Sequence, residues 1–222
     1  MQFRLTLDDE LLASNSGRDE KAARKEYKRD LRRQFHFQLK RVFEATPFLA
    51  SGSPDGSQLG GPVVAIGASG FGGFPGQPTQ YAHVRLPVYD RHTIIQRYKR
   101  QGFNFLPLVS DELKLSCSLD VLMLRRDNQT SRRDVDNHLK TLCDALTLPD
   151  ANQDYHLIAP KEDEDPFYCL LSDDKLISKV AVETDQLLSD IPGKPPSPHD
   201  VRLVITVRIQ PYQFMLDNLM FT

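Results

Sequence analysis

The sequence lacks any apolar run long enough to cross a membrane, and it has only three cysteines in 222 residues. A transmembrane helix needs roughly 20 consecutive apolar residues, and the first residues also lack the apolar core of a signal peptide. Cys117, Cys143 and Cys169 are an odd number without the spacing of metal ligands, which favours reduced thiols. We therefore expect a cytoplasmic protein that makes no contact with a membrane.

An excess of positive charge is also missing, since the formal net charge is −2. A surface that binds nucleic acid would therefore have to be a local patch. The sequence shows no Ser–His–Asp, Cys–His or clustered His–Cys arrangement, which argues against covalent catalysis. Its hydrophobic share of 40% and charged share of 26% are ordinary for a globular protein. We expect one domain over residues 1–222.

Glycine is scarce outside one segment, because nine of the 12 glycines lie between Gly52 and Gly76. This segment belongs to an insertion predicted for residues 46–110, whose glycine-rich part we expect to be a surface loop. Residues 150–167 are expected to form an acidic insertion loop, and residues 211–222 an apolar C-terminal extension. The aromatic and leucine residues near the end of the first insertion are candidates to dock it on the core.

Apolar patterns predict strands at residues 2–7, 83–88, 113–124 and 201–209. A long helix is predicted for residues 19–44, with one apolar stripe. Its other face carries many Lys and Arg side chains, which either contact phosphates or form ion pairs with acids on the same helix. A short basic helix is expected over residues 91–101.

The most informative stretch runs from Ser131 to Lys140 and continues into a helix that ends before Pro149. Asp134 or Asp136 can cap the first turn, because a short carboxylate accepts free backbone N–H groups there. Apolar residues at helical spacing form a stripe for the core, namely Leu139, Leu142, Cys143 and Leu146. Residues four apart form a polar face, namely Asp136, Lys140 and Asp144.

Two carboxylates held at one helix start need a compensating cation. Like charges about 4 Å apart repel by about 4 kcal/mol at a surface-like dielectric, whereas the helix dipole returns only about 0.3–1 kcal/mol for each acid. A divalent metal, a nearby Lys or Arg, or a proton must supply the difference. Mg²⁺ suits a small number of hard oxygen ligands. The alternative is an N-cap plus a solvated acid that pairs with Arg132 or Arg133.

A second acidic pair, Asp173-Asp174, precedes a further predicted strand. With the first stretch, it resembles the RusA family of Holliday-junction resolvases. The matching elements, in chain order, are Arg132-Arg133, Asp134-Val135-Asp136-Asn137, Lys140, Asp144-Ala145-Leu146 and Asp173-Asp174. The resemblance covers mainly residues 113–209, plus the first strand and helix. The chain departs from the compact, strongly basic family members in its net charge and in its two insertions.

The resemblance implies a single RusA-like nuclease domain with an α+β (mixed α/β) fold, in which a small mixed sheet packs against helices. It implies Mg²⁺, with Mn²⁺ as a substitute, bound by Asp134, Asp136 and Asp174, and with Asp173 as an alternative ligand. Lys140 matches the functional lysine. Asn137 would support the turn, and Asp144 would pair with Lys140. Flanking phosphates would be held by a set of cations, namely Arg125, Arg126, Arg132, Arg133, Lys175 and Lys179.

The implied activity is a Mg²⁺-dependent endodeoxyribonuclease that nicks branched DNA and resolves Holliday junctions in recombination and repair. Carboxylate-bound Mg²⁺ can activate water and stabilise the charge of a phosphodiester under attack. The resemblance also implies a homodimer, which the sequence does not show by itself. The alternative is a non-catalytic DNA-junction binding or scaffold protein that retains the carboxylates as relics.

Overall fold

The computed structural model describes nine ranges of the chain, namely residues 1–10, 20–50, 63–67, 81–85, 90–126, 135–149, 160–193, 195–197 and 200–222. No helix in these ranges is long and apolar enough to cross a membrane. The main sheet has four strands in the order β1 (Gln2–Glu10), β9 (Asp200–Pro211), β6 (Leu115–Arg125) and β8 (Ile177–Gln186). β9 runs antiparallel to both β1 and β6, whereas β8 runs parallel to β6.

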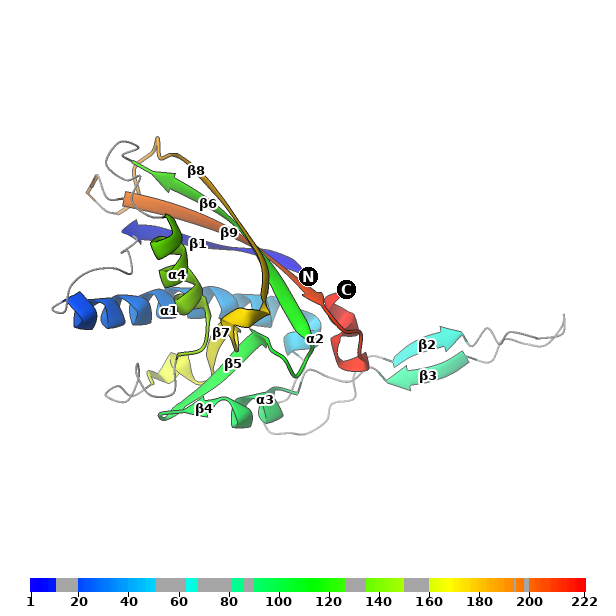
Figure 1. Cartoon of the computed structure of the whole chain (residues 1–222). Helices are drawn as coiled ribbons and strands as arrows, with labels where there is room; N and C mark the ends of the chain where they lie inside the picture. Colours follow the sequence, from blue (N-terminus) through cyan, green and yellow to red (C-terminus); the bar gives the residue numbers. More distant parts are fainter. Residues whose placement is uncertain are drawn as a thin grey trace.

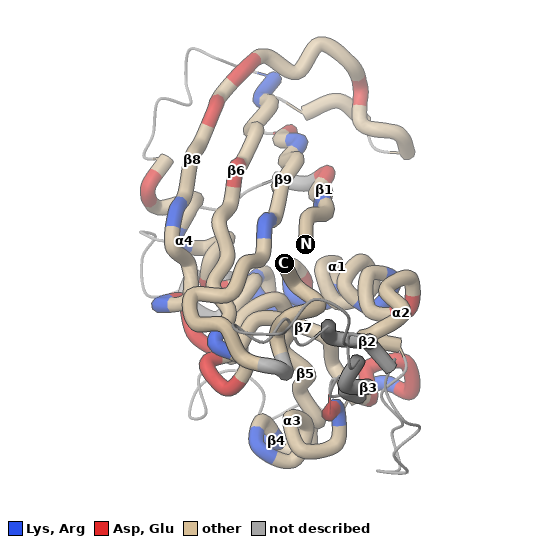
Figure 2. The backbone as a smooth tube through the Cα atoms, turned by 90° about the vertical axis from the view of Figure 1, so that its right-hand side faces the viewer, with Lys and Arg blue, Asp and Glu red and all other residues tan. Residues whose placement is uncertain are grey.

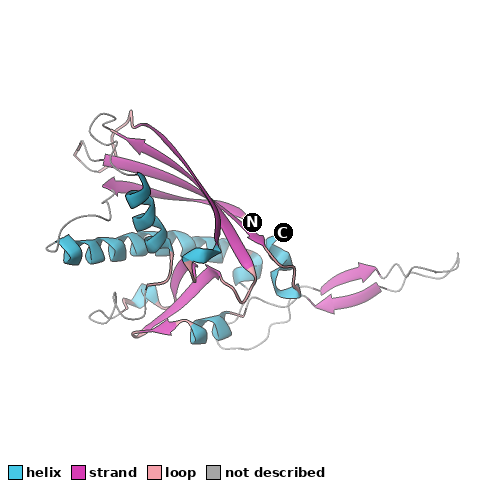
Figure 3. Ribbon diagram, viewed as in Figure 1, coloured by secondary structure: helices cyan, strands magenta, loops and turns pink. Residues whose placement is uncertain are grey.

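The strands of the main sheet alternate as their sequences predict. Leu5 and Leu7 of β1 are buried, while Arg4 and Thr6 between them are exposed. One face of a sheet against helices and the other against water produces this period of two. Figure 3 shows the helices on one side of this sheet. The core therefore lies between the main sheet and the helices.

A second sheet contains β4 (Lys99–Arg100), β5 (Phe103–Val109) and β7 (Phe167–Leu171). β5 pairs with β7 in parallel, and β4 pairs with β5 antiparallel. A separate hairpin joins β2 (Val63–Gly67) to β3 (Tyr81–Arg85). The long helix α1 (Glu20–Ala45) lies between the main sheet and the second sheet (Figure 1).

The remaining helices are short. They are α2 (Pro47–Ala50), α3 (Arg91–Arg97), α4 (Val135–Leu146) and the 3₁₀ turns η1 (Glu162–Glu164), η2 (Asp174–Leu176) and η3 (Leu216–Phe221). The helix α4 follows β6 and precedes β7 along the chain. It therefore belongs to the crossover that connects the parallel strands β6 and β8.

The predicted α+β class with a mixed sheet is confirmed, together with the helix near residues 19–44 and the strands near residues 2–7, 113–124 and 201–209. The predicted docking of the last part of the range 46–110 on the core is confirmed. Phe103, Phe105, Leu106 and Leu108 are fully buried in the one core cluster. They belong to β5, which is a strand of the core.

Candidate functional site

The helix α4 presents two of the predicted site residues to solvent. Asp136 lies in its first turn and Lys140 lies one turn later, and both side chains are exposed. The opposite side of the helix packs on the core through Leu142, Ala145 and Leu146. Asp134, Arg132 and Arg133 lie outside the described residues, so their predicted roles stay predictions.

Asp144 has a different partner from the one that the sequence predicts. Its carboxylate forms an ion pair with Lys28 of α1, with Nζ and Oδ2 2.5 Å apart, in place of the predicted pairing with Lys140. One turn further along α1, Arg32 donates to the backbone oxygens of Asp144 and Thr147, at 2.8 and 3.3 Å. These carbonyls lie at the C-terminal end of α4, where no helical N–H remains to bond them. α1 therefore fixes the end of α4.

The acidic pair lies on the turn between β7 and β8, next to the end of α4. The Leu148 N–H donates to the Leu171 oxygen at 3.0 Å, which places the end of β7 beside the residues that follow α4. Asp173 caps the 3₁₀ turn η2, because its Oδ1 accepts from the Lys175 N–H at 3.0 Å. This backbone hydrogen bond lowers the pKa of Asp173. With Asp173 engaged as a cap, Asp174 is the better candidate for a metal ligand.

The charge of Asp174 acts on a residue in the later part of α4. Burial raises the pKa of the Cys143 thiol to about 11, and the charges of Asp144 and then Asp174 add to this effect. Cys143 is seven residues after Asp136, and thus on the same face of α4. Asp174 therefore acts on the helix face that also carries Asp136.

A complete metal site is not assembled by the side chains that the structure describes. Within those ranges, no group of three or more His, Cys, Asp or Glu side chains is placed to hold a metal ion. Asp136, Asp173 and Asp174 lie within those ranges, whereas Asp134 lies outside them. The donors themselves are hard carboxylate oxygens in contact with water, which is the chemistry that Mg²⁺ selects.

The predicted phosphate contacts fall into two groups. Arg125 is buried, with 7% of its surface exposed, and its guanidinium contacts the Met123 sulfur. Arg126 pairs with Asp190 at 2.8 Å and with Asp200 at 3.6 Å. The burial of Arg125 contradicts the phosphate contact predicted for it. The ion pairs of Arg126 compete with the phosphate contact predicted for that residue. Lys175 and Lys179 are exposed, as a phosphate contact requires.

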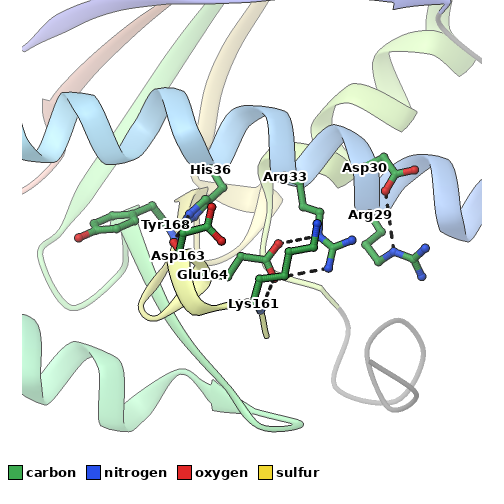
Figure 4. Close-up of polar contacts among 8 residues, drawn as sticks. All are labelled: Arg29, Asp30, Arg33, His36, Lys161, Asp163, Glu164 and Tyr168. Carbon is green, nitrogen blue, oxygen red and sulfur yellow. Dashed lines mark hydrogen bonds and ion pairs between the residues drawn. The ribbon is translucent and has the colours of Figure 1, made fainter. Parts of the chain in front are cut away.

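Several Lys and Arg side chains of α1 contact other segments of the folded chain. Arg33 pairs with Glu164 at 2.6 Å, and Glu164 is fully buried (Figure 4). This contact docks part of the predicted acidic loop on α1, while Glu162 and Asp163 beside it remain exposed. Figure 2 shows basic and acidic positions interspersed along the described strands of the main sheet. The predicted pairing with acids on the same helix is observed for Arg29, which pairs with Glu26 at 3.1 Å. Lys28 and Arg33 pair instead with acids of other segments, and Arg32 with backbone carbonyls.

His36 completes this contact between α1 and the loop. Its Nδ1 accepts the Tyr168 N–H at 2.9 Å, so Nε2 carries the proton and donates to the Asp163 oxygen at 3.0 Å. Burial lowers the pKa of His36, which outweighs the opposing effects of the Asp163 hydrogen bond and the Glu164 charge. The ring is therefore a neutral link between α1 and β7. Sequence patterns could not predict this role, because both partners of the ring are backbone groups.

The comparisons with known proteins give no family assignment. No family model, no curated protein and no solved structure matches the chain.

Proposed function

We propose that the chain is a Mg²⁺-dependent endonuclease that nicks branched DNA in the manner of the RusA family. The observation that supports this proposal is the placement of three predicted site residues. Asp136 and Lys140 are exposed on one helix, and Asp174 is exposed on a turn beside the same helix. Solvent-accessible carboxylates next to a lysine are what a metal-dependent phosphodiesterase requires.

The predicted site residues would have different roles in the reaction. Asp136 and Asp174, with Asp134, would hold the metal, which supplies the activated water and neutralises the leaving oxygen when bound. Lys140 would stabilise the negative charge that grows on the scissile phosphate. Lys175 and Lys179 would hold flanking phosphates, and such contacts position the DNA without reading its bases. Two copies would nick opposed strands of a junction.

The proposal requires Asp136 and Asp174 to share one ion when Mg²⁺ and DNA are bound. Paired labels at Val135→Cys and Lys175→Cys measure the distance between the first turn of α4 and the turn η2 in that complex. A distance too long for a shared ion, in a complex that is shown to cut DNA, would exclude one ion between Asp136 and Asp174.

Among the described residues no group of three acids is placed to hold a metal ion, and this favours a second candidate function. A protein that binds DNA junctions without cutting them would keep the exposed lysines but would have no need to gather the acids. In that case the carboxylates near α4 serve only as caps and ion-pair partners, as Asp173 and Asp144 do in this structure.

One experiment separates the two functions. Purified protein is incubated with end-labelled four-way, forked and linear DNA, with Mg²⁺ or with EDTA. We expect nicks in the branched substrates with Mg²⁺ and none with EDTA. Binding of four-way DNA without nicks under all conditions would favour the scaffold, and equal cutting of linear DNA would reject selectivity for branches.

A further inference from the structure

The helix α3 ends in a buried tyrosine whose hydroxyl is held in place. Tyr98 is the C-cap residue of α3, its N–H donates to the Ile94 oxygen at 3.1 Å, and 9% of its surface is exposed. Its hydroxyl donates to Oε2 of Glu112 at 2.6 Å. A buried hydroxyl needs such a partner, because an unpaired polar group away from water is costly.

Glu112 holds this hydroxyl from the turn between β5 and β6. Its other oxygen, Oε1, accepts from Nη1 of Arg97 at 2.7 Å, so both carboxylate oxygens are engaged. Burial acts to raise the pKa of Glu112, but the hydrogen bonds from Tyr98 and Arg97 outweigh it and lower the pKa. Glu112 is therefore a charged acceptor, and hydrogen bonds to a charged acceptor are stronger than those between neutral groups.

The Tyr98 oxygen also accepts a hydrogen bond from the residue that precedes the acidic turn. Burial and the Glu112 hydrogen bond raise the pKa of Tyr98 to about 12, whereas the hydrogen bond with the Ser172 side chain acts to lower it. A hydrogen bond that lowers the pKa of a phenol is donated to its oxygen. The backbone of Ser172 is held as well, because its N–H donates to the Val109 oxygen at 3.0 Å. Ser172 directly precedes Asp173 and Asp174.

The strand that follows Tyr98 contacts the other half of the candidate site. Arg100 of β4 donates through Nη1 to the Pro149 oxygen at 2.7 Å. Pro149 follows the end of α4, and its neighbour Leu148 donates to the Leu171 oxygen at 3.0 Å. One short segment, residues 97–100, thus contacts both the acidic turn and the residues that follow α4.

We propose that Tyr98 is a positioning residue of the candidate metal site: its hydroxyl, fixed by Glu112, holds Ser172 and with it the turn that carries Asp174. Arg100 fixes the residues after α4 from the same segment. This role rests on the proposed function, in which Asp174 binds the metal. Residues 97–100 belong to the insertion predicted for residues 46–110, so part of that insertion supports the site.

Amide hydrogen exchange tests the contact without metal or DNA. The Lys175 N–H, which donates to Oδ1 of Asp173, reports opening of the acidic turn. Tyr98→Phe keeps the ring and loses the hydroxyl, so exchange at Lys175 should become about threefold faster or more, while the amides of β7 keep their rates. Tyr212→Phe is the matched control, because its hydroxyl donates to Asp111 in the same turn between β5 and β6. Unchanged exchange at Lys175 in Tyr98→Phe, or the same increase in both variants, would overturn the proposal.

The link to the site is tested by the Mg²⁺ requirement of nicking on a four-way junction. Tyr98→Phe and Ser172→Ala should each raise the Mg²⁺ concentration for half-maximal nicking by about tenfold, as expected when a group that orients a metal ligand is lost. The double variant should do no more than either single one, because the two hydroxyls form one contact. Junction binding in EDTA should stay the same, and excess Mg²⁺ should restore the rate.

Two outcomes separate this role from the function on which it rests. A chain that nicks DNA, but whose Mg²⁺ requirement does not move in Tyr98→Phe, would overturn the positioning role alone. Additive effects of Tyr98→Phe and Ser172→Ala would do the same. An unsubstituted chain that nicks no DNA would reject the proposed function, and the positioning role with it.

Discussion

Lys28 and Asp144 join α1 to α4 through an ion pair between residues 116 positions apart. Both side chains are partly exposed, at 24% and 32%. The pair fixes the polar face of α4 that also carries Lys140. Asp144, the acid of the Asp-Ala-Leu element, therefore connects α4 to α1 and does not pair with Lys140 inside α4.

A double-mutant cycle measures this pair. Lys28→Met, Asp144→Asn and the double variant should give a coupling free energy of about 0.5–1 kcal/mol in urea unfolding, as expected for a partly exposed pair. The matched cycle of Lys140→Met with Asp144→Asn should give a coupling near zero. A larger coupling with Lys140 than with Lys28 would contradict the structural assignment.

Arg32 should matter more for stability than its neighbours on α1. It is 5% exposed and donates to two carbonyls at the end of α4. Arg32→Met would leave these partly buried acceptors without their donor and should cost about 1–3 kcal/mol of unfolding free energy. The control is Arg29→Met, whose partners Glu26 and Asp30 lie on the same helix. Equal losses for the two variants would argue against the capping role.

Because of His36, the folded protein should lose stability in mild acid. Because the folded chain holds the pKa of His36 below its ordinary value of 6.5, the unfolded chain takes up a proton first as the pH falls. Unfolding free energy should therefore decrease from about pH 6.5 downward to the lower folded pKa, by at most about 1.4 kcal/mol per pH unit. Lys40, Asp163 and Glu164 also act on the ring, and their net effect does not reverse the shift.

His36→Gln provides the comparison, since an amide can replace both ring contacts without titrating. Chemical unfolding at pH 7.5 and pH 5.5 should show a smaller difference for this variant than for the unsubstituted chain. The same difference in both proteins would mean that other groups cause the acid sensitivity.

The two exposed lysines beside the acidic turn should contribute to the electrostatic part of DNA binding. Replacing both Lys175 and Lys179 by Ala should reduce the slope of log affinity against log salt by about two, at about one per phosphate contact. Lys99→Ala, on the second sheet, is the control and should leave the slope unchanged. A slope that does not change in the double variant would remove these residues from the DNA surface.

The strands of the main sheet could be predicted because their sequences have clear apolar patterns. β1 alternates, and β6 alternates before it ends in an apolar run over residues 121–124. β5 and β7 could not be assigned in the same way. β5 contains Pro107, and β7 is a five-residue apolar run directly after an acidic segment. Each becomes a strand only because the other lies beside it, which is a relation between residues about 60 positions apart.

The candidate site shows the same limit. Sequence spacing places Asp136 and Lys140 correctly on one helical face, because that depends on helix geometry alone. It could not predict that Asp144 pairs with Lys28, or that Arg125 is buried at the end of β6. Nor could it place Asp174 relative to Asp136. That relation depends on the level at which α4 packs against the turn after β7.

The most direct test of the account compares three carboxylates on one substrate. Asp136→Asn, Asp174→Asn and Glu162→Gln are each assayed for Mg²⁺-dependent nicking and for binding of a four-way junction in EDTA. Glu162, exposed on η1, is the control. The account predicts that Asp136→Asn and Asp174→Asn each lose at least about 100-fold in nicking, or about 2.7 kcal/mol of transition-state stabilisation, and that all three bind the junction. Unchanged nicking by either of the first two variants would contradict it.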